Sequence, residues 1–160
     1  MSIERVKEYF ASRGMGARVI EFTVSSATVD LAAAALGIPG ARIAKTLSFL
    51  VNGAPVLIVC AGDARIDNAK YKAKFAAKAK MLTPDEAVEL IGHAVGGVCP
   101  FAVNDGVTVY LDRSLLRFET VFPAAGSSSS AIELTIPELE EHSGFSEWVD
   151  VTRIPENTEV

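Results

Sequence analysis

Cysteine and histidine are scarce in this sequence of 160 residues, which contains two of each. Two cysteines, Cys60 and Cys99, cannot supply the disulfide framework of a small secreted domain, and two histidines supply a zinc site poorly. Cys60 stands in the apolar run 55–61, where a thiol packs as a small hydrophobic side chain. We therefore expect a reduced protein with no metal site and no cofactor.

Long apolar runs are also missing, since no stretch approaches the ~20 residues that a membrane span needs. The first residues, Met-Ser-Ile-Glu-Arg-Val, have neither the apolar core of a signal peptide nor the Arg-rich character of a transit segment. The hydrophobic content of 49% is distributed in short blocks, as in a compact globule. We expect a cytoplasmic protein with no membrane partner, in which residues 1–153 form one domain and residues 154–160 a polar tail.

Positive charge is in deficit, because the formal net charge is −5, which disfavours a general nucleic-acid binder and a DNA partner. Five lysines nevertheless fall within residues 70–80. A helix capped by Asp67 and running to about Ala77 would place Lys70, Lys74 and Lys78 in one stripe. This stripe is either a solvated helix face or the one basic patch able to contact RNA phosphates.

Local signals predict interspersed helices and strands. Capping residues at Ser2, Thr28, Asp67, Thr83 and Thr135 begin five helices, of which the last two open with a capping box. Strands are expected at 17–22, 43–51, 55–61, 107–112, 120–124, 131–136 and 148–152. The strands 43–51 and 55–61 flank Asn-Gly, the dipeptide that a type I′ hairpin turn prefers. The pattern predicts an α+β fold with a mixed, largely antiparallel sheet.

Lys45 is the first candidate functional residue. Alternation along the strand 43–51 places it on one face with four large apolar side chains and places Thr46 on the opposite face. Burying an unpaired ammonium costs several kcal/mol, so Lys45 must reach solvent, find an anion or lose its proton. Alternatively, it lies near the strand end and extends along the surface to water.

The segment Gly96-Gly97-Val98-Cys99-Pro100 is the second candidate. Paired glycines allow a backbone to approach a ligand closely, and proline fixes the far end of the loop, although a structural turn has the same composition. Cys99 would suit a nucleophile, but no histidine with Asn or Asp accompanies it in suggestive spacing.

Three further features have weaker signals. Asp112 ends a predicted strand, and Gly126 and Ser127 begin a run of four serines; each either faces a pocket or is an ordinary strand end or loop. His93 and His142 have no recognisable partner, and we expect both at the surface.

The order of these pieces resembles the YbaK/ProX family of aminoacyl-tRNA editing domains, to which the prolyl-tRNA synthetase insertion domain belongs. The matching motifs lie between about Ser2 and Val151, nearly the whole chain: Ile43-Ala44-Lys45-Thr46-Leu47, Gly62-Asp63-x-Arg65-Ile66-Asp67, Gly96 to Pro100, Tyr110-Leu111-Asp112, and Gly126-Ser127 followed by Ile132-Glu133-Leu134.

The resemblance implies a barrel-like sheet surrounded by helices and an enzyme that hydrolyses the ester of mischarged tRNA. It implies that Lys45 holds the substrate near the terminal adenosine, and that the backbone of Gly96 and Gly97 positions water or the aminoacyl group. It further implies chemistry that relies on the substrate's ribose hydroxyl and bound water, without a metal.

The implied substrate-binding residues are Thr46, Val98, Cys99, Pro100, Asp112, Gly126 and Ser127, and the expected tRNA contacts are Lys70, Lys74 and Lys78.

Two departures from the family pattern bear on specificity. The alanine-clearing branch more often has Lys-Asn where this chain has Lys45-Thr46, and the serine run lacks the second glycine of the family's Gly-Ser-Gly. We therefore expect a trans-editing deacylase that clears Ser-, Thr- or Cys-charged tRNA faster than Ala-tRNA. Its partners would be the acceptor end of aminoacyl-tRNA and, as a further possibility, an aminoacyl-tRNA synthetase.

Two alternatives stay open: a non-catalytic module that binds tRNA or a synthetase, and a thiol-dependent enzyme that uses Cys99.

Overall fold

The computed structural model describes residues 2–155, so residues 156–160 of the predicted polar tail lie outside the described part of the chain. The α-helices are α1 (Ser2–Ala11), α2 (Val29–Leu36), α3 (Asn68–Phe75), α4 (Pro84–Glu86) and α5 (Ile136–Ser143). Shorter helical turns are η1 (Gly16–Arg18), η2 (Gly40–Arg42), η3 (Ala87–Ile91) and η4 (Arg113–Arg117). The strands are β1 (Val19–Glu21), β2 (Ile43–Val51), β3 (Ala54–Ala61), β4 (Arg65–Ile66), β5 (Thr108–Asp112), β6 (Thr120–Pro123), β7 (Ser130–Ile132), β8 (Leu134–Thr135), β9 (Glu147–Val149) and β10 (Thr152–Arg153).

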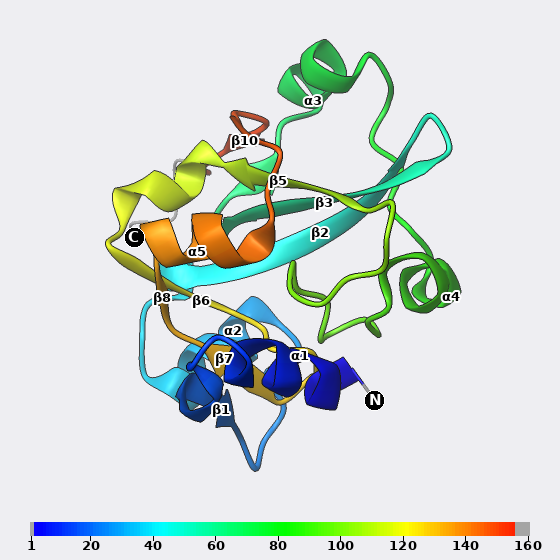
Figure 1. The fold of residues 1–160 in the computed structure, drawn as a ribbon. Coiled ribbons are helices and arrows are strands. Elements are labelled where there is room, and N and C mark those ends of the chain that lie inside the picture. Colours follow the sequence, from blue (N-terminus) through cyan, green and yellow to red (C-terminus); the bar gives the residue numbers. More distant parts are fainter. Residues whose placement is uncertain (1, 156–160) are drawn as a thin grey trace.

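The predicted α+β class is confirmed. A six-stranded sheet has the order β8-β6-β2-β3-β5-β9, and two-stranded pairs form between β1 and β7 and between β4 and β10. The large sheet is mixed, because β2 pairs with β3 antiparallel whereas β3–β5, β5–β9 and β2–β6 are parallel. The long, curled β2–β3 hairpin crosses the middle of the molecule (Figure 1).

Local sequence signals determine the element ends. Asn52 and Gly53 both have positive φ, 51° and 83°, as the type I′ turn of the β2–β3 hairpin requires. Thr83 and Thr135 each form the predicted capping box, and Thr28 and Asp67 cap α2 and α3 through their side chains.

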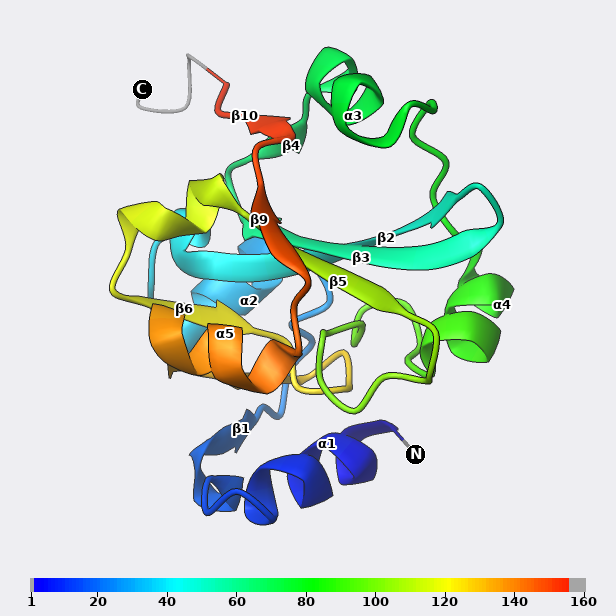
Figure 2. The same ribbon diagram turned by 45° about the horizontal axis from the view of Figure 1, so that its top comes forward.

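Helices cover both sides of the sheet, as both ribbon views show (Figures 1 and 2). On one side, Val6 and Phe10 of α1 and Leu139 of α5 pack against Leu57 and Leu111 of the sheet. On the other side, a second cluster contains Tyr71 and Phe75 of α3 together with Phe49, Val56 and Ile58. Both faces of the central hairpin are therefore buried.

Two expectations about local structure were wrong. Helix α3 ends at Phe75, because Ala76 adopts a left-handed conformation with φ 56°. The Ala76 N–H donates to the Lys72 carbonyl oxygen and forms the C-terminal cap of the helix. Lys78 therefore lies beyond the helix and does not share a helical stripe with Lys70 and Lys74. The histidines are also buried rather than exposed, at 1% exposure for His93 and 6% for His142.

Candidate active site

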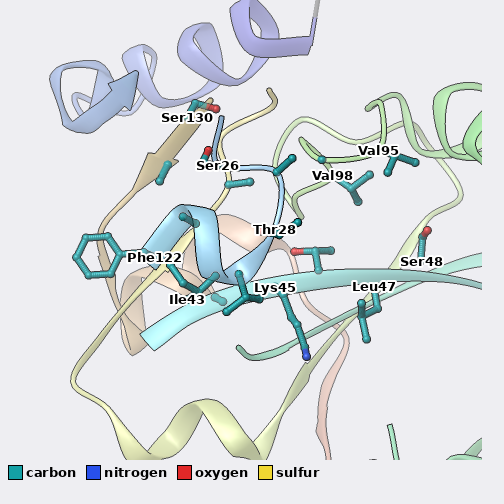
Figure 3. A pocket seen from close by; sticks show the side chains of 18 of the residues that line it. Ser26, Thr28, Ile43, Lys45, Leu47, Ser48, Val95, Val98, Phe122 and Ser130 are labelled. Carbon is teal, nitrogen blue, oxygen red and sulfur yellow. The ribbon is translucent and has the colours of Figure 1, made fainter. Parts of the chain in front are cut away.

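A cavity of about 480 Å³ opens beside β2. Its floor is formed by residues 43–48 of β2, and its walls come from the start of α2, from the segment 81–84, from the glycine loop and from β6 and β7 (Figure 3). Many of its lining side chains are apolar, such as Val29, Val98 and Phe122. Small hydroxyl side chains, among them Ser26 and Ser130, are interspersed between them. The cavity is thus formed by segments that are far apart in the sequence.

The cavity lies where β2 lacks a neighbouring strand on one edge. Strand β6 pairs with β2 only at Ile43 and Ala44, and then turns away after Pro123. Further along β2, the segment that follows α3 is hydrogen-bonded to the same edge. The first of these bonds is at Ser48, whose carbonyl oxygen accepts the N–H of Leu82 at 3.1 Å. Between these two attachments the edge of β2 faces the cavity.

Two hydroxyl groups at the cavity wall have no hydrogen-bond partner among the described residues. The oxygen atoms are Oγ of Ser26 and Oγ1 of Thr46, and both are shielded from bulk water. A buried hydroxyl without a partner costs about 1–3 kcal/mol, so each would gain from a polar group in the cavity. Ser26 is a site residue that sequence reasoning missed, because nothing in a Ser-Ser pair before a helix distinguishes it.

The Lys45 side chain leaves β2 on the side away from Ser26 and Thr28 (Figure 3). It is half-buried and lines the cavity with part of its length. Its ammonium donates to the carbonyl oxygen of Gly62 at 3.3 Å and to that of Ala64. The ammonium therefore has backbone carbonyl partners, an arrangement that was not among those considered from the sequence.

The turn that holds Lys45 is itself braced by an ion pair. Arg117 donates two hydrogen bonds to the Asp63 carboxylate, at 2.6 and 3.1 Å. Hydrogen bonding from Arg117 lowers the pKa of Asp63, and the charge of Lys45 adds to this effect. Lys45 is thus placed against a fixed turn.

The glycine loop packs against the serine loop. A Cβ on Gly97 would lie 2.6 Å from the backbone nitrogen of Ser127, so no larger residue fits. Gly96 has φ 94°, and a Cβ there would crowd Ser128 and Ala27. Of the five loop residues, Gly96 and Val98 line the cavity. The glycines therefore serve close packing between loops, with Gly96 at the cavity wall.

Cys99 lies behind this wall and is fully buried. Its Sγ is 3.6 Å from Nε2 of His93, and that nitrogen is 2.7 Å from the carbonyl oxygen of Phe101. Burial raises the pKa of the Cys99 thiol to about 12 and lowers the pKa of His93. A thiol that keeps its proton and has no access to the cavity argues against the thiol-dependent enzyme.

The four serines after Gly126 form a braced turn. The hydroxyl groups of Ser127 and Ser130 are 2.9 Å apart, and the Ser128 carbonyl accepts the N–H of Ser26 at 2.6 Å. Ser130 lines the cavity, whereas Gly126 packs against the start of α1, where a Cβ would lie 2.7 Å from the Ser2 carbonyl oxygen. This turn therefore positions Ser26.

Asp112 is fully buried, and its carboxylate accepts hydrogen bonds from other residues of the protein. It accepts the N–H of Ser114 at 2.9 Å, the N–H of Val151 at 2.9 Å and the hydroxyl of Thr152 at 2.7 Å. It does not line the cavity. This placement supports a role in joining β5 to the C-terminal strands, and not the substrate contact expected from the sequence.

The lysine cluster divides into two parts. Lys70 pairs with Asp150 at 3.0 Å and Lys74 with Glu147 at 3.0 Å, so nearby carboxylates offset the charges on α3. Lys78 and Lys80 are exposed and lie in the segment that leads to Met81, which lines the cavity. Within the lysine cluster, Lys78 and Lys80 are thus nearer to the cavity along the chain than Lys70 and Lys74 of α3.

Residues 2–155 contain neither a membrane-spanning helix nor a cluster of metal-ligating side chains. No helix there is long and apolar enough to cross a membrane. No group of three or more His, Cys, Asp or Glu side chains in the same range is arranged to hold a metal ion.

The chain is similar to several known proteins. The sequence profile of the family described as "Aminoacyl-tRNA editing domain" matches residues 23–142. The protein YwhH of Bacillus subtilis is 51% identical over 154 residues, which cover 96% of this chain and 98% of that protein. The proline–tRNA ligase of Lactiplantibacillus plantarum is 24% identical over 130 residues, which are 81% of this chain but 22% of the ligase. A solved structure of a candidate trans-editing enzyme for prolyl-tRNA synthetase superposes with a TM-score of 0.84 at 31% identity, covering 95% of this chain and 97% of the other.

Proposed function

Because the chain belongs to the family of aminoacyl-tRNA editing domains, as its resemblance to the YbaK/ProX family predicted, we propose that it is a trans-editing deacylase. It hydrolyses the ester that links a wrong, small amino acid to the end of a tRNA. The observation that carries this proposal is the cavity beside β2, which combines apolar walls with recessed hydroxyl groups and has Lys45 at its margin.

The hydroxyl groups favour amino acids with a hydroxyl or thiol side chain. The hydroxyl groups of Thr46 and Ser26 lack partners within residues 2–155, and a substrate that bonds to them relieves the cost of their burial. A site with such groups discriminates strongly against an analogue that leaves them unpaired. We therefore propose that Ser-, Thr- and Cys-tRNA are cleared faster than Ala-tRNA. Cys99 takes no direct part in this preference, because it lies outside the cavity.

Lys45 supplies the positive charge of the proposed site. Its ammonium has three N–H donors, two of which point to the carbonyl oxygens of Gly62 and Ala64. The remaining donor has no partner in the described part of the chain and is available to a phosphate or ribose oxygen near the terminal adenosine. Holding the ester in a fixed position next to water and the ribose hydroxyl is sufficient to accelerate the hydrolysis of an activated acyl group.

The tRNA itself would be contacted through Lys78 and Lys80. Both residues are exposed and precede Met81, a cavity-lining residue, within three positions of the chain, whereas Lys70 and Lys74 of α3 already have carboxylate partners. A phosphate that binds an unpaired lysine has no internal ion pair to break. We propose this segment, in place of the stripe of Lys70, Lys74 and Lys78, as the main contact with the acceptor end.

A non-catalytic module remains the second candidate, because an ammonium held by two backbone carbonyls also suits a purely structural lysine. Deacylation of tRNAs charged with Ala, Ser, Thr, Cys and Pro distinguishes the two. We expect catalytic release of the amino acid with the highest kcat/KM for a hydroxyl- or thiol-bearing substrate. Binding of charged tRNA without release across the panel would identify a module.

A further inference from the structure

The edge of β2 carries a backbone N–H and a backbone C=O that face the cavity without a partner among the described residues. In the β2–β3 hairpin, backbone groups alternate between the β3 side and the opposite edge. Leu50 N–H donates to the Lys80 carbonyl at 2.8 Å across that opposite edge, and Ser48 accepts from Leu82 there. The even-numbered residues of β2 therefore direct their backbone groups away from β3.

Thr46 is the even-numbered residue in the middle of this gap. The parallel pairing with β6 ends with Ala44 opposite Pro123, so it does not reach Thr46. The segment that contains Met81 joins the edge only from Ser48 onward. The cavity fills the interval, since residues 43–48 form its floor.

Resting on the proposed deacylase function, we infer that the backbone of Thr46 binds the aminoacyl group as if that group were one residue of an added β-strand. In an antiparallel pair, two opposed residues exchange both of their N–H···O=C bonds. The substrate's α-amine donates to the Thr46 carbonyl oxygen, and the Thr46 N–H donates to the ester carbonyl oxygen. The backbone that acts on the substrate is thus that of Thr46, and not that of Gly97, which is packed against Ser127.

This pairing also places the substrate's side chain. Opposed residues in an antiparallel pair direct their side chains to the same face of the sheet. The substrate side chain would therefore lie beside the Thr46 hydroxyl, whereas Lys45 leaves the strand on the other side (Figure 3). A single geometry thus accounts for both the placement of the ester and the proposed preference for a polar side chain.

The Thr46 N–H contributes to the chemical step. When water adds to the ester carbon, the π electrons of the carbonyl move onto its oxygen, and the N–H of Thr46 stabilises the negative charge that develops there. Collapse of this intermediate breaks the bond to the ribose oxygen, which takes up the proton that the attacking water has lost. Removal of one such donor lowers kcat by about 10²- to 10³-fold in enzymes that hydrolyse acyl groups.

The test replaces the N–H of Thr46 by an ester oxygen, using nonsense suppression with the α-hydroxy acid counterpart of threonine. The matched control is the corresponding replacement at Leu50, whose N–H lies on the same edge but bonds to the Lys80 carbonyl beyond the residues that line the cavity. The substrate is whichever of the Ala, Ser, Thr, Cys and Pro tRNAs the wild-type protein hydrolyses fastest. We expect kcat to fall about 10²-fold for the ester at 46 and by less than about threefold for the ester at 50.

A folded ester variant at 46 with wild-type kcat would overturn the inference while leaving the deacylase function standing. If that variant does not fold, Thr46→Pro removes the same N–H at an edge position where proline is tolerated, and Thr46→Val retains it. On Ala-tRNA, the kcat of Thr46→Pro must then lie far below that of Thr46→Val, which also lacks the hydroxyl; equal kcat values for the two variants overturn the inference. A wild-type protein that clears no tRNA of the panel would instead refute the proposed function, and the inference with it.

Discussion

Lys45 and Thr46 are consecutive residues of β2, and their side chains serve opposite sides of the strand. The Lys45 ammonium donates to the Gly62 carbonyl oxygen at 3.3 Å, whereas the Thr46 hydroxyl is buried at the cavity wall without a partner among the described residues. The position of Thr46 on the face opposite Lys45 therefore does not remove it from the site. In the proposed function, this arrangement separates the charged group expected to hold the tRNA end from the hydroxyl group expected to contact the amino acid side chain.

The substitution Thr46→Val tests the second role. Valine keeps the shape and removes the hydroxyl, so it should reduce the preference for Ser- over Ala-tRNA by about 10-fold, in line with one lost hydrogen bond of about 1.5 kcal/mol. The measurement is the ratio of competitive kcat/KM values for the two tRNAs. Thr135→Val, in a helix cap remote from the cavity lining, is the control for a general loss of stability. An unchanged ratio, or a wild-type preference for alanine, would contradict the role given to Thr46.

The glycine loop allows a paired test of packing against thiol chemistry. Cys99→Ser should retain most of the activity, because the thiol is buried, protonated and outside the cavity. Gly97→Val should lower the melting temperature and abolish activity together, since the new side chain would strike the backbone at Ser127. Loss of activity in a stable Cys99→Ser protein, with covalent labelling of Cys99 by iodoacetamide in the wild type, would restore the thiol-enzyme hypothesis.

The two halves of the lysine cluster should respond differently to charge reversal. We expect Lys78→Glu with Lys80→Glu to weaken tRNA binding and to reduce the slope of log K against log salt by about one unit per lost contact. The matched pair Lys70→Glu and Lys74→Glu, in which the carboxylate partners already offset the charges, should have the smaller effect on the slope. Titrations of tRNA binding at several salt concentrations measure both slopes. A larger effect of the α3 pair would indicate that tRNA contacts α3 instead of Lys78 and Lys80.

Acid should remove a contact that joins η1 to α5. Hydrogen bonds from Arg18, at 2.7 and 2.9 Å, lower the pKa of Glu138 to about 2 from its usual 4.5. A depressed pKa contributes stability that is present above the unfolded-state pKa near 4.5 and is lost as the pH falls through about 2.

The difference in unfolding free energy between wild type and Arg18→Gln should therefore shrink as the pH falls from about 4.5 to about 2. Urea titrations at several pH values measure this difference. The same measurement on Lys72→Gln, at an exposed position of α3, is the control. A constant difference between wild type and Arg18→Gln would show that the pair does not stabilise the fold.

Most elements of the fold could be predicted from the sequence because their signals are local. The hairpin at Asn52-Gly53 and the caps at Thr28 and Thr135 each depend on residues within one turn. The end of α3 could not be predicted in this way, since alanine at position 76 has no special preference for the left-handed conformation that it adopts.

The site was only partly predictable because its main feature is not local. The sequence motifs directed attention to Lys45, Thr46 and Gly96, and the structure places all three at the cavity. The gap in the edge of β2 depends on where β6 turns away after Pro123 and on where the segment at Met81 joins, and no short motif encodes either position. For the same reason, no sequence motif indicated that Ser26 and Ser130 line the same cavity as Thr46.

The most direct test of the central claim is the release of labelled serine from Ser-tRNA, with the enzyme far below the substrate concentration, by the wild type and by Lys45→Ala. We predict multiple turnovers by the wild type. For Lys45→Ala, shown to be folded by circular dichroism, we predict a loss of about 2 to 4 kcal/mol of transition-state stabilisation, because a charge fixed at the site is removed. Lys72→Ala should match the wild type. Tight tRNA binding without release by the wild type, or equal rates for the wild type and folded Lys45→Ala, would contradict the account.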